Sequence, residues 1–222
     1  MTIEAIFPDW EVPPNIKAIQ TTRHSKNVIN YINKIDLNFD FLKQVHGKTV
    51  IELPCKQVPA DAAFSYAKNT ICAVRTADCL PILLTNESGS FVAAIHAGWR
   101  GLCAGVIEKT IKTIKTNSQI TAWLGPCISQ ANFEVGAEVY DQFLEMDKNT
   151  LSAFQKYENK YKLSLALASQ IKLEKLKIKK IYGNSITQNY CTYDDIDNFY
   201  SYRRGRDMGR MVTLIWIQEE NF

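Results

Sequence analysis

The chain has 222 residues, of which 46% are hydrophobic and 22% charged, and its formal net charge is +3. This length fits one large domain with a buried core, and the small net charge gives no electrostatic reason to expect nucleic-acid binding. No stretch approaches the roughly 18 apolar residues of a membrane span. The first residues lack the apolar run of a signal peptide, so the six cysteines are expected as reduced thiols of a cytoplasmic protein.

The first half of the sequence is dominated by short predicted strands. Strands are expected over residues 15–23 and, with a break at Gly47, over 39–53, and a short turn or helical piece is expected at 60–65. Residues 70–76, 79–85 and 90–96 are apolar runs bounded by turn residues, which is typical of buried strands.

Helices enter the predicted pattern from the middle of the chain onward. Apolar residues recur at helical spacing from Gly101 to Lys115, and further helices are expected over 136–146 and 163–176. Strands are expected at 120–125, 177–183 and 211–217, and the polar stretch 146–162 is a place where an insertion or a trimmed loop is expected. Because strands outnumber helices and do not alternate strictly with them, the pattern predicts a mixed-sheet α+β domain rather than a dinucleotide-binding fold.

One cysteine and two histidines stand at breaks in this pattern. Cys79 begins a predicted strand, His96 ends another, and His46 lies where a strand breaks in the QVHG segment. Such positions are where a rigid scaffold can direct several side chains to one point. Each residue alone has an ordinary structural explanation, but two imidazoles and one thiolate together form a ligand set that Zn²⁺ uses when one position stays open to water.

A zinc ion at these residues would define a specific chemistry. It would lower the pKa of a bound water to about 7, and Asp78, next to Cys79, is the candidate to carry the proton. A multicopper centre needs many imidazoles, whereas the whole chain has three histidines. Zinc is therefore expected, and copper is not expected as a multicopper centre.

Several arginines could bind an anion. Arg23 ends the first predicted strand, and Arg203 and Arg204 lie in the segment FYSYRRGRDMGR before the last one. The planar guanidinium group suits phosphate or carboxylate, so these three are candidate substrate or phosphate ligands. Arg206 and Arg210 are interpreted as solvated surface residues.

Seven motifs between Thr21 and Ile217 together resemble those of the YfiH-like proteins: QVHG, ADAAFS, TADCLPILL, AAIHAGWRGL, LGPCIS, FEVG and FYSYRR followed by GR. That family has been labelled polyphenol oxidase or laccase, purine nucleoside phosphorylase, and peptidoglycan editing factor. The resemblance implies a four-layer α/β/β/α sandwich with mixed sheets, here one domain over residues 1–222. It implies zinc held by His46, Cys79 and His96.

The resemblance also implies an activity. The expected reactions are phosphorolysis of adenosine, inosine, guanosine and methylthioadenosine, together with adenosine deamination. Arg23 matches the arginine of the family's TTR segment, and Arg203 and Arg204 match the pair in SYRR. The family usually continues TTR with a Gly-Gly turn, whereas this chain has 24-HSKN-27, which puts phosphate or ribose contacts near position 25 in question.

Three functions remain open at this point. The leading one is a cytoplasmic zinc enzyme that acts on purine nucleosides and phosphate. In the second, Cys79 is a nucleophile with His96 as its base and Asp78 as the orienting group, and it hydrolyses an amide of a peptidoglycan precursor. The third is a non-catalytic, zinc-stapled accessory protein that binds envelope-synthesis enzymes. The sequence does not specify an oligomeric state.

Overall fold

The computed structural model describes residues 2–26, 41–55, 58–184, 188–205 and 207–219. Its centre is a six-stranded mixed sheet, in which β12 and β3 are parallel to their neighbours β8 and β4 and the other pairs are antiparallel. The strands, in spatial order, are β12 (Lys180–Gly183), β8 (Ile120–Leu124), β6 (Leu80–Asn86), β7 (Val92–Ala97), β4 (Ala62–Ser65) and β3 (Val50–Glu52).

A second sheet packs against one face of the first, and it is antiparallel throughout. Its strands, in spatial order, are β1 (Ala5–Ile6), β2 (Ile16–Thr21), β13 (Met211–Ile217) and β5 (Cys72–Thr76). A small third sheet is formed by β10 (Phe154–Tyr157), β11 (Lys160–Leu163) and β9 (Glu134–Val135).

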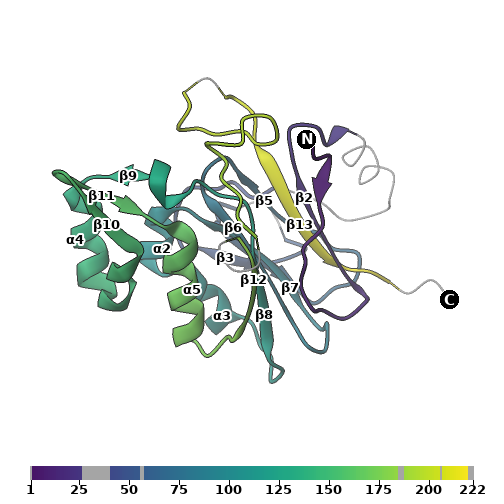
Figure 1. Ribbon diagram of the computed structural model, residues 1–222. Coiled ribbons are helices and arrows are strands. Elements are labelled where there is room, and N and C mark those ends of the chain that lie inside the picture. The colour runs from purple at the N-terminus through teal and green to yellow at the C-terminus, as the bar shows by residue number, and fades with distance from the viewer. Residues whose placement is uncertain (1, 27–40, 56–57, 185–187, 206, 220–222) are drawn as a thin grey trace.

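Helices lie on the other face of the six-stranded sheet, opposite β2 and β13 (Figure 1). They are α2 (Trp99–Ala104), α3 (Val106–Thr113), α4 (Ala137–Met146) and α5 (Leu165–Lys175), with short 3₁₀ turns at η1 (Gln130–Asn132) and η2 (Lys148–Ala153). The described residues thus form one helical layer and two sheet layers. The second helical layer of the expected sandwich is not among the described residues.

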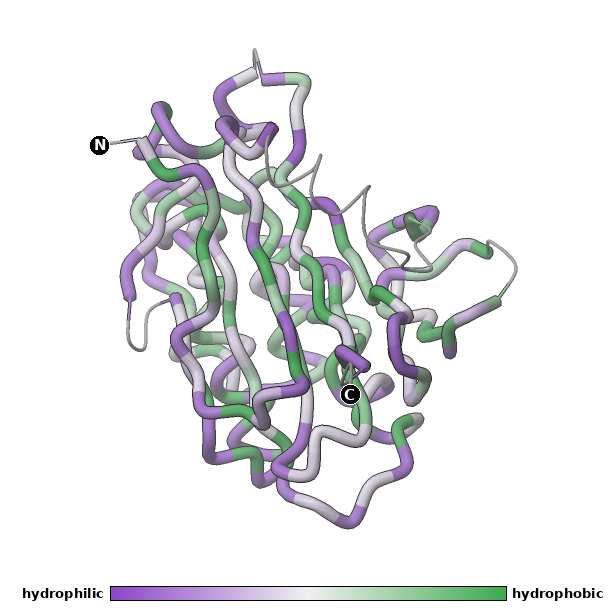
Figure 2. Tube along the Cα trace, turned by 90° about the vertical axis from the view of Figure 1, so that its right-hand side faces the viewer, coloured by the Kyte–Doolittle hydropathy of each residue, from purple (hydrophilic) through white to green (hydrophobic). Residues whose placement is uncertain are grey.

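Both faces of the six-stranded sheet are buried, which explains why its strands are almost continuously apolar. On β6, Ile82 and Leu84 point into the core shared with the helices, whereas Leu83 points into the core between the two sheets. Figure 2 shows hydrophobic stretches running along the strands. Within the described residues, no helix is both long enough and apolar enough to cross a bilayer.

The α+β class with mixed sheets is confirmed, but several predicted elements are corrected. Residues 60–65 contain strand β4 rather than a turn or helical piece, and 41–46 form no strand, while 39–40 lie outside the described residues. The helix expected from Gly101 to Lys115 is two helices, because Gly105 adopts the left-handed conformation with φ of 87°. The stretch 146–162 is not a plain loop, since it includes η2, β10 and most of β11.

Candidate metal centre and adjoining cavity

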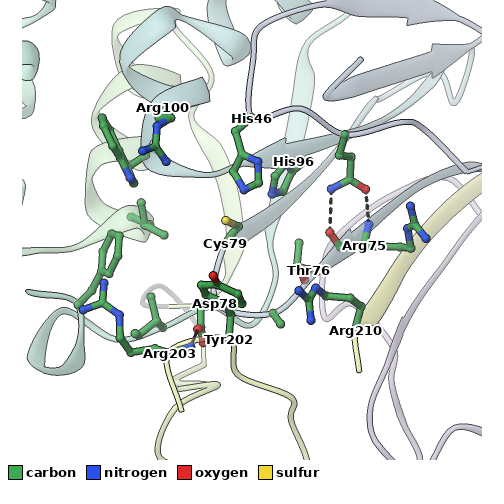
Figure 3. A pocket seen from close by; sticks show the side chains of 16 residues that line it. His46, Arg75, Thr76, Asp78, Cys79, His96, Arg100, Tyr202, Arg203 and Arg210 are labelled. Carbon is green, nitrogen blue, oxygen red and sulfur yellow. Dashed lines mark hydrogen bonds between the residues drawn. The ribbon is translucent and has the colours of Figure 1, made fainter. Parts of the chain in front are cut away.

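The three predicted ligand residues come together at one edge of the six-stranded sheet. Pro81 on β6 pairs with His96 on β7, so Cys79, just before β6, lies beside the imidazole of His96. His46 comes from the loop before β3, and its φ of 60° turns the side chain toward the other two. One ligand atom from each residue lies within 4.8 Å of the others. Figure 3 shows the three side chains facing one another.

This donor set fits a metal ion. An ion bound to nitrogen at about 2.1 Å and to sulfur at about 2.3 Å holds its ligands at most about 4.4 Å apart. The observed spread of up to 4.8 Å lies slightly beyond this limit, and the exposed His46 is the ligand with the most room to move, since His96 is buried. Two imidazoles and a thiolate leave at least one coordination position for another molecule.

Asp61 holds this cluster together, although the sequence did not single it out. It is fully buried at the start of β4, and its carboxylate accepts hydrogen bonds from the backbone N–H groups of Val45, His46 and Gly47. The same carboxylate lies 2.8 Å from Nδ1 of His96. Asp61 therefore fixes the QVHG loop and leaves Nε2 of His96 to face the cluster. The one available signal was an aspartate in the otherwise apolar segment ADAAF.

The electrostatics of the cluster favour a thiolate. Burial raises the pKa of Cys79, but hydrogen bonds with His46 and His96 outweigh this effect and bring that pKa from 9.0 down to about 7. Burial lowers the pKa of His96, but hydrogen bonds with Asp61 and Cys79 raise it to about 9. For Asp61, burial raises the pKa, while the His96 and Gly47 hydrogen bonds bring it below its ordinary value.

Two glycines of the HAGWRG segment allow the backbone to approach the cluster. A Cβ atom on Gly98 would lie 3.0 Å from Sγ of Cys79 and 3.2 Å from Cδ2 of His46. A Cβ atom on Gly101 would lie 2.9 Å from the backbone oxygen of Gly47. Gly101 therefore requires glycine because of its close approach to backbone, whereas a side chain at Gly98 would press on Cys79 and His46.

Replacing Gly98 by alanine is expected to weaken metal binding about tenfold, because the added methyl group displaces two ligand side chains. The backbone at Gly98, with φ of −74° and ψ of 163°, is accessible to alanine, so the free energy of unfolding of the metal-free protein should change little. Gly136→Ala is a matched control, since Gly136 caps α4 with φ of −76° and ψ of 171°. Equal metal affinities of the two variants, measured by chelator competition, would contradict the expectation.

The cluster lies at one wall of a cavity of about 740 Å³. On one side the cavity is lined by Trp99 and Phe133, a pair that we call the aromatic end. Here the guanidinium carbon of Arg100 lies 4.4 Å from the centre of the Trp99 ring, and that of Arg203 lies 5.2 Å from the centre of Phe133. The aromatic end therefore combines flat apolar surface with positive charge.

Asp78 also lines the cavity, but its carboxylate faces the C-terminal segment. It accepts hydrogen bonds from the Thr192 hydroxyl at 2.7 Å, the Ser201 hydroxyl at 3.0 Å and the backbone N–H of Arg203 at 2.7 Å. Its φ of 86° is unusual for a residue other than glycine. This arrangement favours a role for Asp78 in positioning Arg203 over the role of a proton carrier.

The other two predicted anion ligands are paired with a carboxylate. Arg23 and Arg204 both form ion pairs with Asp207, at 2.5 and 2.7 Å. Arg23 also donates to the backbone oxygen of Phe199, and Arg204 donates to the backbone oxygens of Phe199, Thr192 and Tyr193. Neither arginine lines the cavity. They hold the turn that follows the SYRR motif, whereas Arg203 reaches the cavity.

Asp207→Asn is expected to lower the free energy of unfolding at pH 7 by about 2 kcal/mol, because it removes charged hydrogen-bond partners from two arginines. Burial raises the pKa of Asp207, but Arg23, the Ser201 N–H and Arg204 lower it to about 2. Because this pKa lies below the ordinary 3.8, the contribution is present above pH 4 and is lost as the pH falls toward 2. Urea unfolding of wild type and Asp207→Asn at several pH values measures this contribution. Asp141→Asn, at an exposed position, is the control. If the difference in the free energy of unfolding between Asp207→Asn and wild type did not shrink on acidification, the expectation would be contradicted.

Arg210 is exposed, as expected from the sequence, and it also lines the cavity, as does Arg75. Figure 3 shows Arg210 and Thr76 on the same side of the cavity. Arg206 lies outside the described residues. Sequence spacing could not distinguish Arg210 from Arg204, because both lie in the same glycine-interrupted segment, FYSYRRGRDMGR.

Comparison with known proteins assigns the chain to a family. Residues 20–218 match the family described as multi-copper polyphenol oxidoreductase laccase, and the chain belongs to that family. Its relatives are named for a different activity. The chain is 38% identical over 248 residues to a protein of Haemophilus influenzae named purine nucleoside phosphorylase, covering 97% of this chain and all of that protein.

Two further relatives agree with this assignment. Over 181 residues the chain is 43% identical to the Escherichia coli protein named purine nucleoside phosphorylase YfiH, covering 80% of this chain and 73% of that one. The crystal structure of the Neisseria meningitidis protein NMB0706 superposes with a TM-score of 0.88 at 31% identity, covering 98% of this chain and all of that one. The resemblance to YfiH-like proteins and the mixed-sheet α+β fold are therefore confirmed.

Proposed function

We propose that this protein is a zinc-dependent purine nucleoside phosphorylase that also deaminates adenosine. The observation that carries the proposal is the convergence of His46, Cys79 and His96 on one point at the wall of a cavity that combines aromatic and cationic side chains. The names of the relatives support phosphorolysis. Adenosine, inosine, guanosine and methylthioadenosine are the proposed substrates, with phosphate as the second one.

Zinc is proposed because the cluster offers three ligand atoms, two imidazole nitrogens and one sulfur. Two imidazoles and one thiolate suit zinc with an open position. The third histidine, His24, is elsewhere, with Nε2 2.7 Å from the backbone oxygen of Asp197. The three histidines of the chain therefore cannot supply the imidazoles of a multicopper centre, whatever the family is called. When bound, zinc would supply Lewis acidity toward substrate oxygens and would lower the pKa of a water molecule.

The chain's own residues would bind and orient the two substrates. A purine ring would stack on the aromatic end, where stacking contributes about 1 kcal/mol and the guanidinium groups of Arg100 and Arg203 can donate to base atoms. Asp78 holds Arg203 in this position through its backbone N–H. Arg23 and Arg204 act indirectly, because they fix the turn that carries Arg203.

The proposed reaction is balanced without an outside oxidant or reductant. An oxygen of hydrogenphosphate forms a bond to C1′ of the ribose as the bond from C1′ to N9 of the purine breaks. The base leaves with the bonding electrons and carries the proton that hydrogenphosphate brought. In the deamination, water adds to C6 of adenosine and ammonia leaves.

Measuring the release of base from inosine with and without phosphate tests the phosphorylase proposal. We expect hypoxanthine and ribose 1-phosphate in equal amounts, only when phosphate is present, and loss of this activity after removal of metal by a chelator. Inosine formed from adenosine tests the deamination separately. Base release that is independent of phosphate would contradict phosphorolysis.

A second candidate rests on the contacts of the cluster. Cys79 has hydrogen bonds to His46 and His96, and Asp61 orients His96 from behind. This is the arrangement of a cysteine nucleophile, its base and an orienting carboxylate. Asp61 takes the orienting role that the sequence suggested for Asp78. An amide of a peptidoglycan precursor remains the proposed substrate for this alternative.

Alkylation by iodoacetamide separates the two candidates. A metal-bound thiolate is protected until a chelator removes the ion, whereas a free nucleophilic thiolate is alkylated at once. Rapid modification of Cys79 in the metal-loaded protein, located by peptide mass spectrometry, would favour the cysteine hydrolase. Protection that disappears on chelation would favour the metal enzyme.

A further inference from the structure

The cavity has a polar end, opposite the aromatic end, whose residues belong neither to the His46–Cys79–His96 cluster nor to the aromatic end. In Figure 3, Thr76 and Arg210 lie on one side of Cys79, and Arg100 and Arg203, which contact the rings of Trp99 and Phe133, lie on the other. Arg203 lies over Phe133 of the aromatic end, and Arg23 and Arg204 lie outside the cavity.

The side-chain hydroxyl of Thr76 has no hydrogen-bond partner among the described residues. Thr76 is the last residue of β5, its side chain lines the cavity, and it is 1% exposed. Its Oγ1 atom is buried. Buried hydroxyl groups in proteins are nearly always hydrogen-bonded, so an unpaired one in a cavity wall points to a ligand atom.

Arg210 lines the same cavity as Thr76 and comes from the neighbouring strand end. Thr76 on β5 pairs with Met211 on β13, and Arg210 directly precedes Met211. Its guanidinium donates at 2.8 Å to the backbone oxygen of Gly209. Among the carboxylates that the structure describes, none forms an ion pair with Arg210. Its charge is therefore available to an anion, unlike the charges of the arginines that pair with Asp207.

The strand end that carries Thr76 is also held in place. The side chain of Gln44 accepts a hydrogen bond from the backbone N–H of Arg75 and donates one to its backbone oxygen, both at 2.8 Å. These two bonds tie the end of β5 to the loop that contains His46. A binding group on this strand end therefore keeps a fixed position relative to the metal cluster.

We propose that Thr76 and Arg210 form a subsite for a phosphate group, with the hydroxyl and the guanidinium as its donors. The inference rests on the proposed function, since phosphorolysis brings a phosphate to the cavity and leaves one on the product sugar. It deepens that function by placing the phosphate at the end away from the aromatic rings. The base and the phosphate would then approach the ribose from opposite sides of the metal cluster.

Steady-state kinetics of the full-length, metal-loaded protein test the subsite. Thr76→Val, which keeps the side-chain shape, and Arg210→Gln should each raise the KM for phosphate about tenfold or more, the loss expected for one strong hydrogen bond. The KM for inosine should stay within about twofold. Lys17→Gln, which removes an exposed charge on β2 outside the cavity, is the control. An unchanged KM for phosphate in both variants would overturn the subsite and leave the phosphorylase proposal intact.

A binding measurement makes the test independent of turnover. Inorganic phosphate and ribose 1-phosphate should each raise the Tm of the wild-type protein, and both shifts should disappear in Thr76→Val and Arg210→Gln. If the variants lost the Tm shift for only one of these two ligands, the subsite would be assigned to that ligand. If these shifts behave as expected but no base is released from inosine, the subsite stands and the phosphorylase proposal fails. Shifts that persist unchanged in both variants, or no shift in the wild type, would overturn the subsite.

Discussion

Cys79→Ala is expected to abolish stable metal binding and to lower phosphorolysis about a thousandfold or more. The substitution removes the one sulfur ligand of the cluster and leaves His46 and His96 as the two nitrogen ligands. A metal ion contributes several kcal/mol to the stabilisation of transition-state charge, and about 4 kcal/mol corresponds to a thousandfold change in rate. Metal content per chain and the rate of base release from inosine are the two measurements.

The matched control for this substitution is Cys103→Ala. Cys103 is a buried thiol on α2 outside the cluster, and its replacement removes the same atoms from the chain. The control should keep its metal and most of its turnover. If Cys79→Ala retained one metal ion per chain and wild-type turnover, the thiolate would have no part in the chemistry and the metal mechanism would fail.

Asp61→Asn is expected to have the second largest effect, although Asp61 does not line the cavity and is not one of the three candidate ligands. Its carboxylate accepts from three backbone N–H groups and lies within hydrogen-bond distance of the His96 imidazole, and an amide can replace only part of these bonds. Loss of such a buried network costs about 3 kcal/mol in the free energy of unfolding. Metal affinity should fall about 10- to 100-fold, as for other groups that orient a histidine ligand.

Chelator competition and urea unfolding of the metal-free protein separate these two effects. If Asp61 acts on the cluster through His96 and the QVHG loop, the drop in metal affinity persists under conditions where the variant is fully folded. Asp141→Asn on the exposed face of α4 is the control and should change neither quantity. Wild-type metal affinity in Asp61→Asn would show that the hydrogen bonds of Asp61 do not orient the ligands.

The strands of the two main sheets could largely be predicted from the sequence, because burial on both faces makes them apolar and short. The segment 60–65 was misinterpreted because alanine, aspartate and serine have weak strand propensity, and its strand β4 forms only through pairing with β7 and β3. The helix break at Gly105 was missed because the apolar spacing continues on both sides of it. Strands β9, β10 and β11 were missed because they are polar and pair mainly with one another.

The residues of the candidate site could likewise be predicted only in part. Residues at strand ends, such as Cys79 and His96, could be found because their position in the pattern is local. Asp61 and Thr76 could not, since their roles depend on contacts between segments far apart in the sequence. The partners of the arginines could not be predicted from the sequence either. Only the structure shows that Arg23 pairs with Asp207, whereas Arg210 lines the cavity.

X-ray absorption spectroscopy at the zinc edge of the metal-loaded protein tests whether Cys79 and two histidines hold zinc with one position open. We expect one zinc ion per chain with one sulfur ligand, two imidazole nitrogens and one further light atom that changes when phosphate is added. A coordination shell without sulfur, or a closed shell of four protein ligands that ignores phosphate, would contradict this expectation.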